Sequence, residues 1–180
     1  MQHEGGQVAT ARLKKTVFPT VSQVRELPLQ HRYTVPADWR DRNGHVNVQY
    51  YLRLYDLGGY EILEGANVDV DFMAEHGFGL FDIEHHIKFR SEVLVGNEVS
   101  GYNRLLGLSE KRFHGMYFIV NDSQDRLACT VEYLSAGVDL GTRRGAVFPD
   151  LMKSGLAALL EKHQGLSWPA PVCGAMAVAG

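Results

Sequence analysis

Apolar residues recur at helical spacing in one stretch of the chain, and the rest of the sequence is organised around that stretch. The apolar positions, at i, i+3, i+4, i+7, i+11, i+14 and i+15, are Val48, Tyr51, Leu52, Tyr55, Gly59, Ile62 and Leu63. This spacing places them on one buried face of a helix. We therefore predict a long helix from Asn47 to about Glu64. Asn47 suits the N-cap, because its side-chain oxygen can accept a hydrogen bond from an orphan N–H of the first turn.

Two adjacent glycines, Gly58 and Gly59, fall inside this predicted helix. Each lowers the stability of a helix by about 1 kcal/mol relative to alanine. Glycine is tolerable in a helix where a neighbouring backbone must come close. A sheet wrapped around the helix would require such an approach, so the pair favours an enclosed, central helix.

Alternation of apolar and polar residues predicts strands on both sides of this helix. A first strand runs from Leu29 to Val35 and is ended by Pro36. After the helix, the longest alternation runs over residues 81–89. Its two predicted faces carry Phe81, Ile83, His85, Ile87 and Phe89 on one side and Asp82, Glu84, His86, Lys88 and Arg90 on the other.

Three more strands are predicted over residues 98–106, 111–120 and 127–138, separated by turn residues. The core-facing residues of the last two are Phe113, Tyr117, Ile119, Leu127, Cys129, Val131 and Tyr133. With the strand over 81–89, these segments predict a four-stranded antiparallel meander. Pro149 suits the first turn of a second helix that runs to about His163.

The pattern divides the chain into an N-terminal extension (1–28), one domain (29–164) and a C-terminal tail (165–180). The extension is expected to be loosely held. The tail is rich in glycine, proline and alanine and is expected to be mobile. Residues 68–79 carry no clear periodicity, and we expect them to be irregular and to cover part of a pocket.

Composition narrows the class of protein further. The 180 residues suit one domain with a sizeable core. The formal net charge is −3 with no basic block, which argues against non-specific nucleic-acid binding. Two cysteines make no disulfide framework, no apolar run reaches the roughly 18 residues of a membrane helix, and the N-terminus lacks a signal-peptide core. We expect a cytoplasmic protein with no membrane or nucleic-acid partner.

Candidate chemistry is concentrated just before the predicted helix, in the heptapeptide from Asp41 to Asn47. This segment contains an acid, a glycine turn, a histidine and an asparagine. The start of a helix attracts negative charge and can stabilise an oxyanion. The order of the elements therefore brings polar side chains to the positive end of a buried helix.

With these elements in order, the sequence resembles the hotdog-fold acyl-CoA thioesterases of the 4-hydroxybenzoyl-CoA thioesterase type. Their pattern is a strand and then Asp-x-x-Gly-His-Val-Asn-Asn-x-x-Tyr at the start of a central helix. The matching residues here are Asp41, Gly44, His45, Val46, Asn47 and Tyr51. The resemblance covers about residues 29–162. It implies an α+β hotdog fold, in which an antiparallel sheet wraps around a long central helix.

The chain also departs from that pattern. Val48 replaces the usual second asparagine, and Trp39 stands where an acid is often found. The residues around Trp39 and Tyr50, with His86 and the segment 111–114, look closer to the thioesterases that act on betainyl-CoA in carnitine breakdown. A trimethylammonium group is bound by aromatic faces and carboxylates. Aromatic side chains are available for this, although those of the helix also suit its buried face.

The resemblance implies that Asp41 is catalytic. A carboxylate can attack the thioester carbonyl and form a mixed anhydride, or it can deprotonate a water. The alternative role for Asp41 is to cap the loop before the helix. His45 would orient Asp41 or bond the substrate, or else simply bond a loop carbonyl. Asn47 would cap the helix and also fix a catalytic water.

The predicted substrate contacts are spread more widely. They are Trp39, Asn43, Gly44, Val48, Tyr50, Tyr51, His86, Arg112 and His114. Backbone N–H groups around Val48 to Tyr50 are expected to hold the oxyanion of the tetrahedral intermediate. Arginines 112, 143 and 144 and Lys111 could meet the phosphates of coenzyme A, and solvation of the surface explains them equally well.

Other chemistries and partners remain to be weighed. His85 and His86 are adjacent in a strand and point to opposite faces, so we expect no metal site. No nucleophile-elbow motif supports a serine triad.

Coenzyme A enters as part of the substrate, and no other cofactor is expected. The resemblance implies a homodimer or a dimer of dimers. The rival functions are a hotdog hydratase or dehydratase and a non-catalytic acyl-CoA-binding protein.

Overall fold

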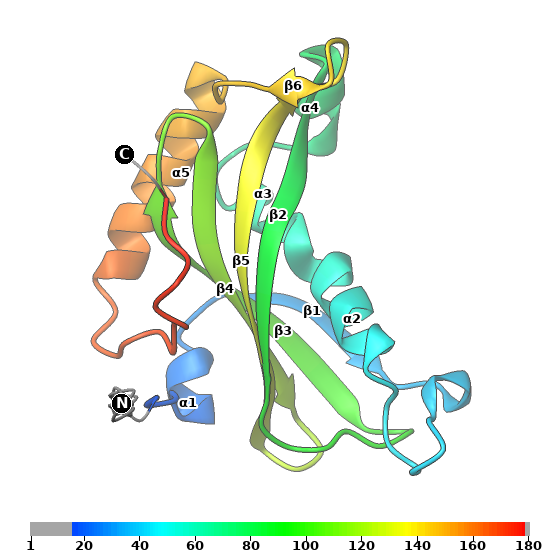
Figure 1. Ribbon diagram of the computed structural model, residues 1–180. Helices are drawn as coiled ribbons and strands as arrows, with labels where there is room; N and C mark the ends of the chain where they lie inside the picture. Colours follow the sequence, from blue (N-terminus) through cyan, green and yellow to red (C-terminus); the bar gives the residue numbers. More distant parts are fainter. Residues whose placement is uncertain (1–15, 179–180) are drawn as a thin grey trace, which may run out of the picture.

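The computed structural model describes residues 16–178 and consists of one curled antiparallel sheet with its central helix on the concave side (Figure 1). The strands are β1 (Leu29–Thr34), β2 (Phe78–Phe89), β3 (Glu98–Leu108), β4 (Arg112–Asn121), β5 (Arg126–Asp139) and β6 (Arg144–Gly145). The helices are α1 (Val21–Val24), the 3₁₀ turn η1 (Ala37–Trp39), α2 (Gln49–Gly59), α3 (Glu61–Glu64), α4 (Val70–Glu75) and α5 (Asp150–Gln164).

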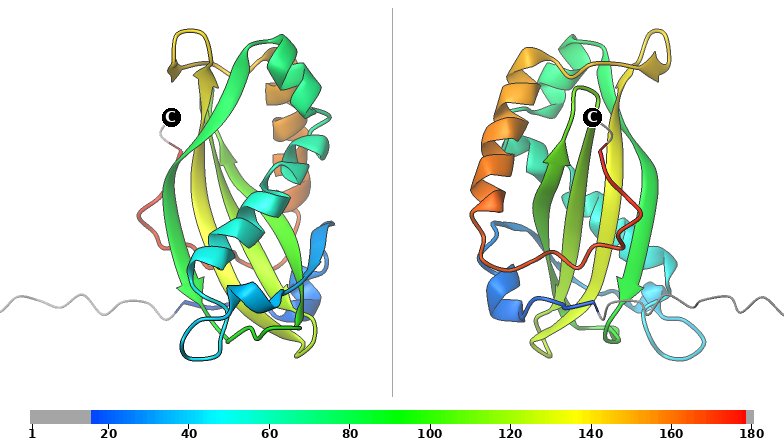
Figure 2. Two further views of the ribbon diagram at one scale, coloured as in Figure 1. Left: turned by 90° about the vertical axis from the view of Figure 1, so that its right-hand side faces the viewer. Right: turned by 60° about the vertical axis from the view of Figure 1, so that its left-hand side comes forward.

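The sheet curls around α2, which Figure 2 shows inside the curve. The strand order is β1-β3-β4-β5-β2, and β6 pairs with β5. The main core lies between α2 and the sheet, and α5 closes its far end with Met152, Leu156 and Leu159. The predicted α+β arrangement, an antiparallel sheet wrapped around a central helix, is confirmed.

The predicted helix from Asn47 to Glu64 is two helices. The first begins at Gln49, with Val48 in the cap position, and ends at Gly59. Tyr60 separates it from α3. Paired glycines lower helical stability and are a common cause of kinks. The bend therefore follows the glycine pair that the sequence already showed.

Gly58 is the point of closest approach between α2 and the sheet. Tyr117 on β4 and His31 on β1 share a hydrogen bond of 2.7 Å directly beneath it. A Cβ on Gly58 would overlap the Tyr117 hydroxyl and lie 2.5 Å from His31 Nδ1. The expectation of a close neighbour at a glycine was right, but the neighbours are two side chains rather than a backbone.

This packing gives a paired prediction for the two glycines. Gly58→Ala should lower the free energy of unfolding by about 1–3 kcal/mol, because an overpacked core must shift. Gly59→Ala should raise it by about 0.5–1 kcal/mol, because only the glycine penalty is removed. At Gly59 the nearest atom to a new Cβ is Tyr55 Cζ at 4.0 Å. Urea unfolding measures both changes; equal effects at the two positions would contradict this account.

The predicted four-stranded meander is wrong for β2. Only β3, β4 and β5 follow one another across the sheet, and β2 pairs with β5, from Phe78 opposite Asp139 to Phe89 opposite Cys129. Residues 90–97 therefore cross the end of the sheet to reach β3. Periodicity identifies a strand but not its neighbour, and this crossover passes beside the start of α2.

A register shift in β2 between Asp82 and Glu84 changes which residues face α2. Asp82 points to the core side, where the Tyr55 hydroxyl donates to it at 2.6 Å, while Phe81 is 63% exposed. The sequence pattern had placed Phe81 on the same face as His85, and Asp82 on the other face. A bulge inserts one unpaired residue and inverts the alternation on one side of it, so strict period-two reasoning fails at this point.

A second, smaller core covers the convex face of the sheet. Its buried residues are Val24, Leu27, Tyr102, Met116, Phe118, Val120 and Trp168. Because both faces of the central strands are covered, every residue of β4 after Arg112 is buried. This arrangement explains why the apolar pattern of the middle strands is nearly continuous.

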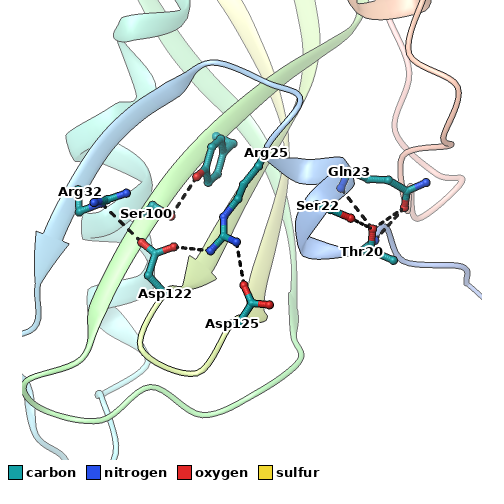
Figure 3. A network of polar contacts seen from close by, with 9 residues as sticks. Thr20, Ser22, Gln23, Arg25, Arg32, Ser100, Asp122 and Asp125 are labelled. Atoms are coloured by element: carbon teal, nitrogen blue, oxygen red, sulfur yellow. Dashed lines mark hydrogen bonds and ion pairs between the residues drawn. The ribbon is translucent and has the colours of Figure 1, made fainter.

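The N-terminal segment contributes to this second core. Thr20 and Gln23 form a capping box at the start of α1. Arg25 then donates to Asp122 at 3.0 Å and to Asp125 at 2.8 Å in the turn between β4 and β5 (Figure 3). Residues 16–28 are thus fastened to the sheet by charge-assisted bonds. The rest of the predicted extension, residues 1–15, lies outside the described residues.

The C-terminal segment lies across the convex face instead of projecting from it (Figure 2). Trp168 is 3% exposed, and the Arg104 guanidinium donates to its carbonyl at 2.7 Å. His163 Nδ1 accepts the Leu105 N–H at 2.9 Å, where β3 extends beyond its pairing with β1. Burial lowers the pKa of His163 to about 4, so this acceptor stays neutral at pH 7.

The stretch predicted to be irregular, residues 68–79, contains α4. The Asp69 side chain accepts the Phe72 N–H at 2.7 Å and begins the helix. An aspartate N-cap is a local helix signal, and the apolar periodicity of a short segment does not reveal it. Among the described residues, no helix is long and apolar enough to cross a membrane.

Candidate active site at the start of the central helix

The loop before α2 is held together by Asp41. Asp41 Oδ1 accepts the N–H of Asn43 at 2.8 Å and the N–H of His45 at 3.0 Å. The Asp41 N–H in turn donates to the His45 carbonyl at 2.7 Å. Gly44 sits between them at φ +88°, a left-handed conformation that favours glycine. Both loop bonds use one carboxylate oxygen, which leaves Oδ2 as the oxygen available for chemistry.

The crossover between β2 and β3 fixes the other side of the loop. The Val46 N–H donates to the Val93 carbonyl at 2.9 Å, and the Asn47 N–H donates to the Trp39 carbonyl at 2.8 Å. His45 also forms a β-bridge with Leu94. The loop is therefore a small sheet-like platform, and Asp41 stands on it in a fixed position.

Asn47 organises the first turn of the helix. Its side-chain oxygen accepts the Gln49 N–H at 3.2 Å, and its carbonyl accepts the Tyr50 N–H at 3.0 Å. The predicted capping bond is thus present, one residue before the assigned cap. In the described part of the chain, the N–H of Val48 donates to no acceptor. Of the predicted oxyanion donors from Val48 to Tyr50, Val48 is the free one.

His45 is positioned by a residue that the sequence reasoning missed. Its Nε2 lies 2.9 Å from Glu92 Oε2 in the crossover. His45 meets Asp41 through its backbone, not through its imidazole. The sequence gives little signal for Glu92: it lies three residues after the end of β2, and only the path of the crossover brings it to the loop.

An open hollow of about 420 Å³ brings these groups together. Its lining residues are Asp41, His45, Val46, Val48, Tyr51, Phe89, Arg90, Ser91 and Glu92. Tyr51 forms its floor and meets the Phe89 ring edge-on, with centroids 5.0 Å apart. Burial raises the pKa of Tyr51 to about 12, so its hydroxyl keeps its proton.

Two predicted substrate contacts, Trp39 and Tyr50, are not among the residues that line this hollow. Trp39 is 3% exposed and lies between Tyr33 and Tyr50, with ring centroids at 5.0 and 4.5 Å. This stack supports the 3₁₀ turn that delivers Asp41. Asn43 and Gly44 remain in the loop beside the acid.

Three other predicted contacts lie elsewhere on the sheet. His114 is buried on the convex face, where Nε2 is 3.0 Å from Glu132 Oε1. His86 lies on the same face, because it pairs directly with Glu132 across β2 and β5. Arg112 begins β4 and is exposed. Within one chain, the structure does not bring these residues to Asp41.

A second polar group lies on the concave face, farther along α2. Asp82 Oδ2 accepts from Tyr55 at 2.6 Å and contacts His85 Nε2 at 2.9 Å, and Asp82 Oδ1 accepts from Ser135. The bulge in β2 makes this cluster possible, since Asp82 and His85 would otherwise face opposite sides. The cluster lines a hollow of about 180 Å³.

The fold and this loop define a known class of protein. Residues 35–156 match the family model described as the thioesterase-like superfamily, and the chain belongs to that superfamily.

Curated relatives narrow the comparison. The chain is 27% identical over 139 residues to the betainyl-CoA thioesterase of Pseudomonas aeruginosa, a match that covers 76% of this chain and 87% of the relative. It is 31% identical over 138 residues to the L-carnitine dehydrogenase/betainyl-CoA thioesterase of Ruegeria pomeroyi, covering 75% of this chain and 27% of that relative. The chain thus spans about a quarter of the length of the two-activity relatives.

Solved structures confirm the fold. A hypothetical protein from Staphylococcus aureus in complex with CoA superimposes with a TM-score of 0.73 at 21% identity, over 85% of this chain and 97% of that one. The 1,4-dihydroxy-2-naphthoyl-CoA thioesterase from Synechocystis has a TM-score of 0.62 at 18% identity, over 72% and 95%. The hotdog fold implied by the resemblance is confirmed.

Proposed function

We propose that this protein is an acyl-CoA thioesterase that hydrolyses a small acyl-CoA to the free acid and coenzyme A, with Asp41 as its catalytic carboxylate. The observation that carries the proposal is the placement of Asp41: it lines the hollow at the start of α2, and two backbone N–H groups hold a single one of its oxygens. Membership of the thioesterase-like superfamily supports the reaction class. Both cysteines are free, which suits a reducing compartment such as the cytoplasm.

Two routes are open to Asp41 Oδ2. It can attack the thioester carbonyl, so that the thiolate of coenzyme A leaves and a mixed anhydride forms, which water then hydrolyses. It can instead take a proton from a water that attacks the same carbonyl. In both routes the carbonyl oxygen becomes negative, and the N–H of Val48 at the positive end of α2 can stabilise it.

Asp82 is the rival carboxylate, and its bonding makes it less suitable. Both of its oxygens already accept hydrogen bonds from protein groups. Burial alone would raise its pKa, but bonds from His85, Ser135 and Tyr55 outweigh burial and hold the pKa below its usual value. An oxygen that accepts no hydrogen bond is the better nucleophile or base, and among the described residues none donates to Asp41 Oδ2.

Asp41→Asn should retain the fold, because the amide oxygen can still accept the two loop N–H groups, and should lower kcat by at least about 100-fold. The measurement is release of free thiol from acyl-CoA substrates, with circular dichroism to check the fold. Asp38→Asn is the matched control: Asp38 is an exposed aspartate three residues earlier and should leave kcat unchanged. If Asp41→Asn keeps activity within a few-fold of the natural enzyme, Asp41 is not catalytic.

The acyl group that we propose is a betaine or a similar small cation. The curated relatives are betainyl-CoA thioesterases, and the hollow offers both kinds of group that bind a quaternary ammonium. Tyr51 and Phe89 supply aromatic surface, and Glu92 supplies negative charge. Trp39 was the expected aromatic contact, but its place inside the stack leaves this role to Phe89, which is 50% exposed.

The substrate prediction is tested with betainyl-CoA and its neutral isostere, 3,3-dimethylbutanoyl-CoA. We expect kcat/KM to favour the cation by about 5- to 30-fold, corresponding to roughly 1–2 kcal/mol. Phe89→Leu should remove most of that preference. Phe81→Leu is the control on the same strand, since Phe81 lies by the other hollow. Equal rates on both substrates, or a preference for aromatic or long acyl groups, would refute a cationic substrate and leave the thioesterase proposal standing.

We also propose that the working unit is a homodimer or a dimer of dimers. β2 is an edge strand of the sheet, and it exposes Phe81 and Ile83 at 63% and 44%. An apolar edge strand with unpaired backbone groups is a template for pairing with another chain. A second copy would cover both the edge and these side chains.

Light scattering at micromolar concentration should therefore give at least twice the 20.1 kDa mass of the chain. Ile83→Glu should shift the protein toward monomer, because charge on an edge strand opposes pairing. Leu151→Glu, at an exposed apolar position on α5, should not. A mass of about 20 kDa for the natural chain would be evidence against the assembly.

A further inference from the structure

The convex face of the sheet holds a cluster of three side chains that the proposed reaction does not use. His86, Glu132 and Cys173 bring one nitrogen, one carboxylate oxygen and one sulfur within 4.8 Å of one another. Cys173 belongs to the C-terminal segment, which lies on the side of the sheet away from α2 (Figure 2). The cluster is therefore separate from the hollow at Asp41.

Two strands and the C-terminal segment build this cluster. His86 and Glu132 are direct partners across β2 and β5, so their side chains leave the same face. Cys173 arrives from the C-terminal segment, and its N–H donates to Glu132 Oε2 at 2.6 Å. Lys88 Nζ donates to the Pro171 carbonyl at 2.8 Å and holds the segment in place two residues earlier. The backbone is thus fixed on all sides of the three ligand atoms.

The Glu132 carboxylate and one nitrogen of His86 are shielded from water. Glu132 is 1% exposed, and His114 Nε2 is its neighbour at 3.0 Å. His86 Nδ1 is buried and has no hydrogen-bond partner among the described residues. A buried carboxylate thus lies beside an unpartnered nitrogen and a thiol.

We propose that His86, Glu132 and Cys173 bind a zinc ion that ties the C-terminal segment to the sheet. Imidazole nitrogen, carboxylate oxygen and thiolate are the donors that Zn²⁺ takes in proteins, whereas a sulfur ligand is unsuited to Mg²⁺ or Ca²⁺. The metal would displace the thiol proton, which passes to solvent. A water would fill the fourth position of the tetrahedron.

The surroundings fit this ion in two further respects. Bonds of about 2.0–2.3 Å in a tetrahedron require ligand atoms roughly 3.3–3.8 Å apart. The three ligand atoms lie within 4.8 Å of one another, so reaching these separations needs a shift of at most about 1–1.5 Å. His114 already bonds the Glu132 carboxylate, as an outer-shell group does when it orients a metal ligand. His114 is therefore a positioning residue in this proposal.

The prediction of no metal was based on His85 and His86, and the structure does place that pair on opposite faces. His85 bonds Asp82 on the concave side, while His86 faces Glu132 on the convex side. That prediction did not consider Glu132 and Cys173. Cys173 is 87 residues away from His86 in the sequence, and only the path of the C-terminal segment makes them neighbours.

The test uses the full chain after removal of metal with a chelator, and titrates it with Co²⁺ as a spectroscopic substitute for Zn²⁺. We expect one equivalent per chain, with a thiolate-to-cobalt charge-transfer band and displacement by Zn²⁺. Cys173→Ser should abolish the band, although the buried Cys129 thiol remains, and His86→Gln should weaken binding by more than about 100-fold. His76→Gln, at an exposed histidine directly after α4, is the control and should change nothing.

A second readout reports on the C-terminal segment itself. Zn²⁺ should slow proteolysis within residues 165–178 and raise Tm in the natural chain, and it should do neither in Cys173→Ser. The absence of a charge-transfer band, or equal Co²⁺ affinity in the natural chain and both ligand variants, would overturn the site. Activity toward acyl-CoA is measured separately through Asp41→Asn, so failure of one proposal is distinguishable from failure of the other.

Discussion

The contact between α2 and the sheet at Gly58 sets the depth at which the central helix lies. The Tyr117–His31 hydrogen bond occupies the space that a side chain at position 58 would fill. With the helix this close, its buried face meets β3 and β4, and its N-terminus is carried to the end of the sheet where residues 90–97 cross over. The position of Asp41 is therefore a consequence of how closely the helix and sheet pack, as well as of its own loop.

Each side of the sheet holds a carboxylate that is fixed by hydrogen bonds, Asp41 on one side and Glu132 on the other. On the concave face, Asp41 has one oxygen fixed by backbone N–H groups and one left available. On the convex face, Glu132 is buried and accepts from His114 and from the backbone of Cys173. A buried carboxylate is costly unless it is hydrogen-bonded or bound to a metal. This physical requirement distinguishes Asp41, the more accessible acid to which we assign catalysis, from the enclosed Glu132, which we assign to a metal.

Local sequence patterns were enough to predict the fold class and most of the loop at Asp41. The apolar stripe before Glu64 and the alternation after Phe81 predicted a helix and strands, because side-chain period depends on backbone geometry alone. The order of Asp41, Gly44 and Asn47 likewise predicted a turn and a capped helix, since each bond spans only a few residues. The resemblance to hotdog thioesterases added the expected role of Asp41, which no periodicity could supply.

What the sequence by itself determined, then, is the type and order of the main strands, the central helix and the loop at Asp41, which short-range bonding and periodicity control. The tertiary structure alone decided the pairing of β2 with β5, the bulge that turns Asp82 inward, the meeting of His45 with Glu92 and the approach of Cys173 to His86. Each of these depends on which distant segments become neighbours. That choice is made by the burial of both sheet faces at once, a property of the whole chain that no local window contains.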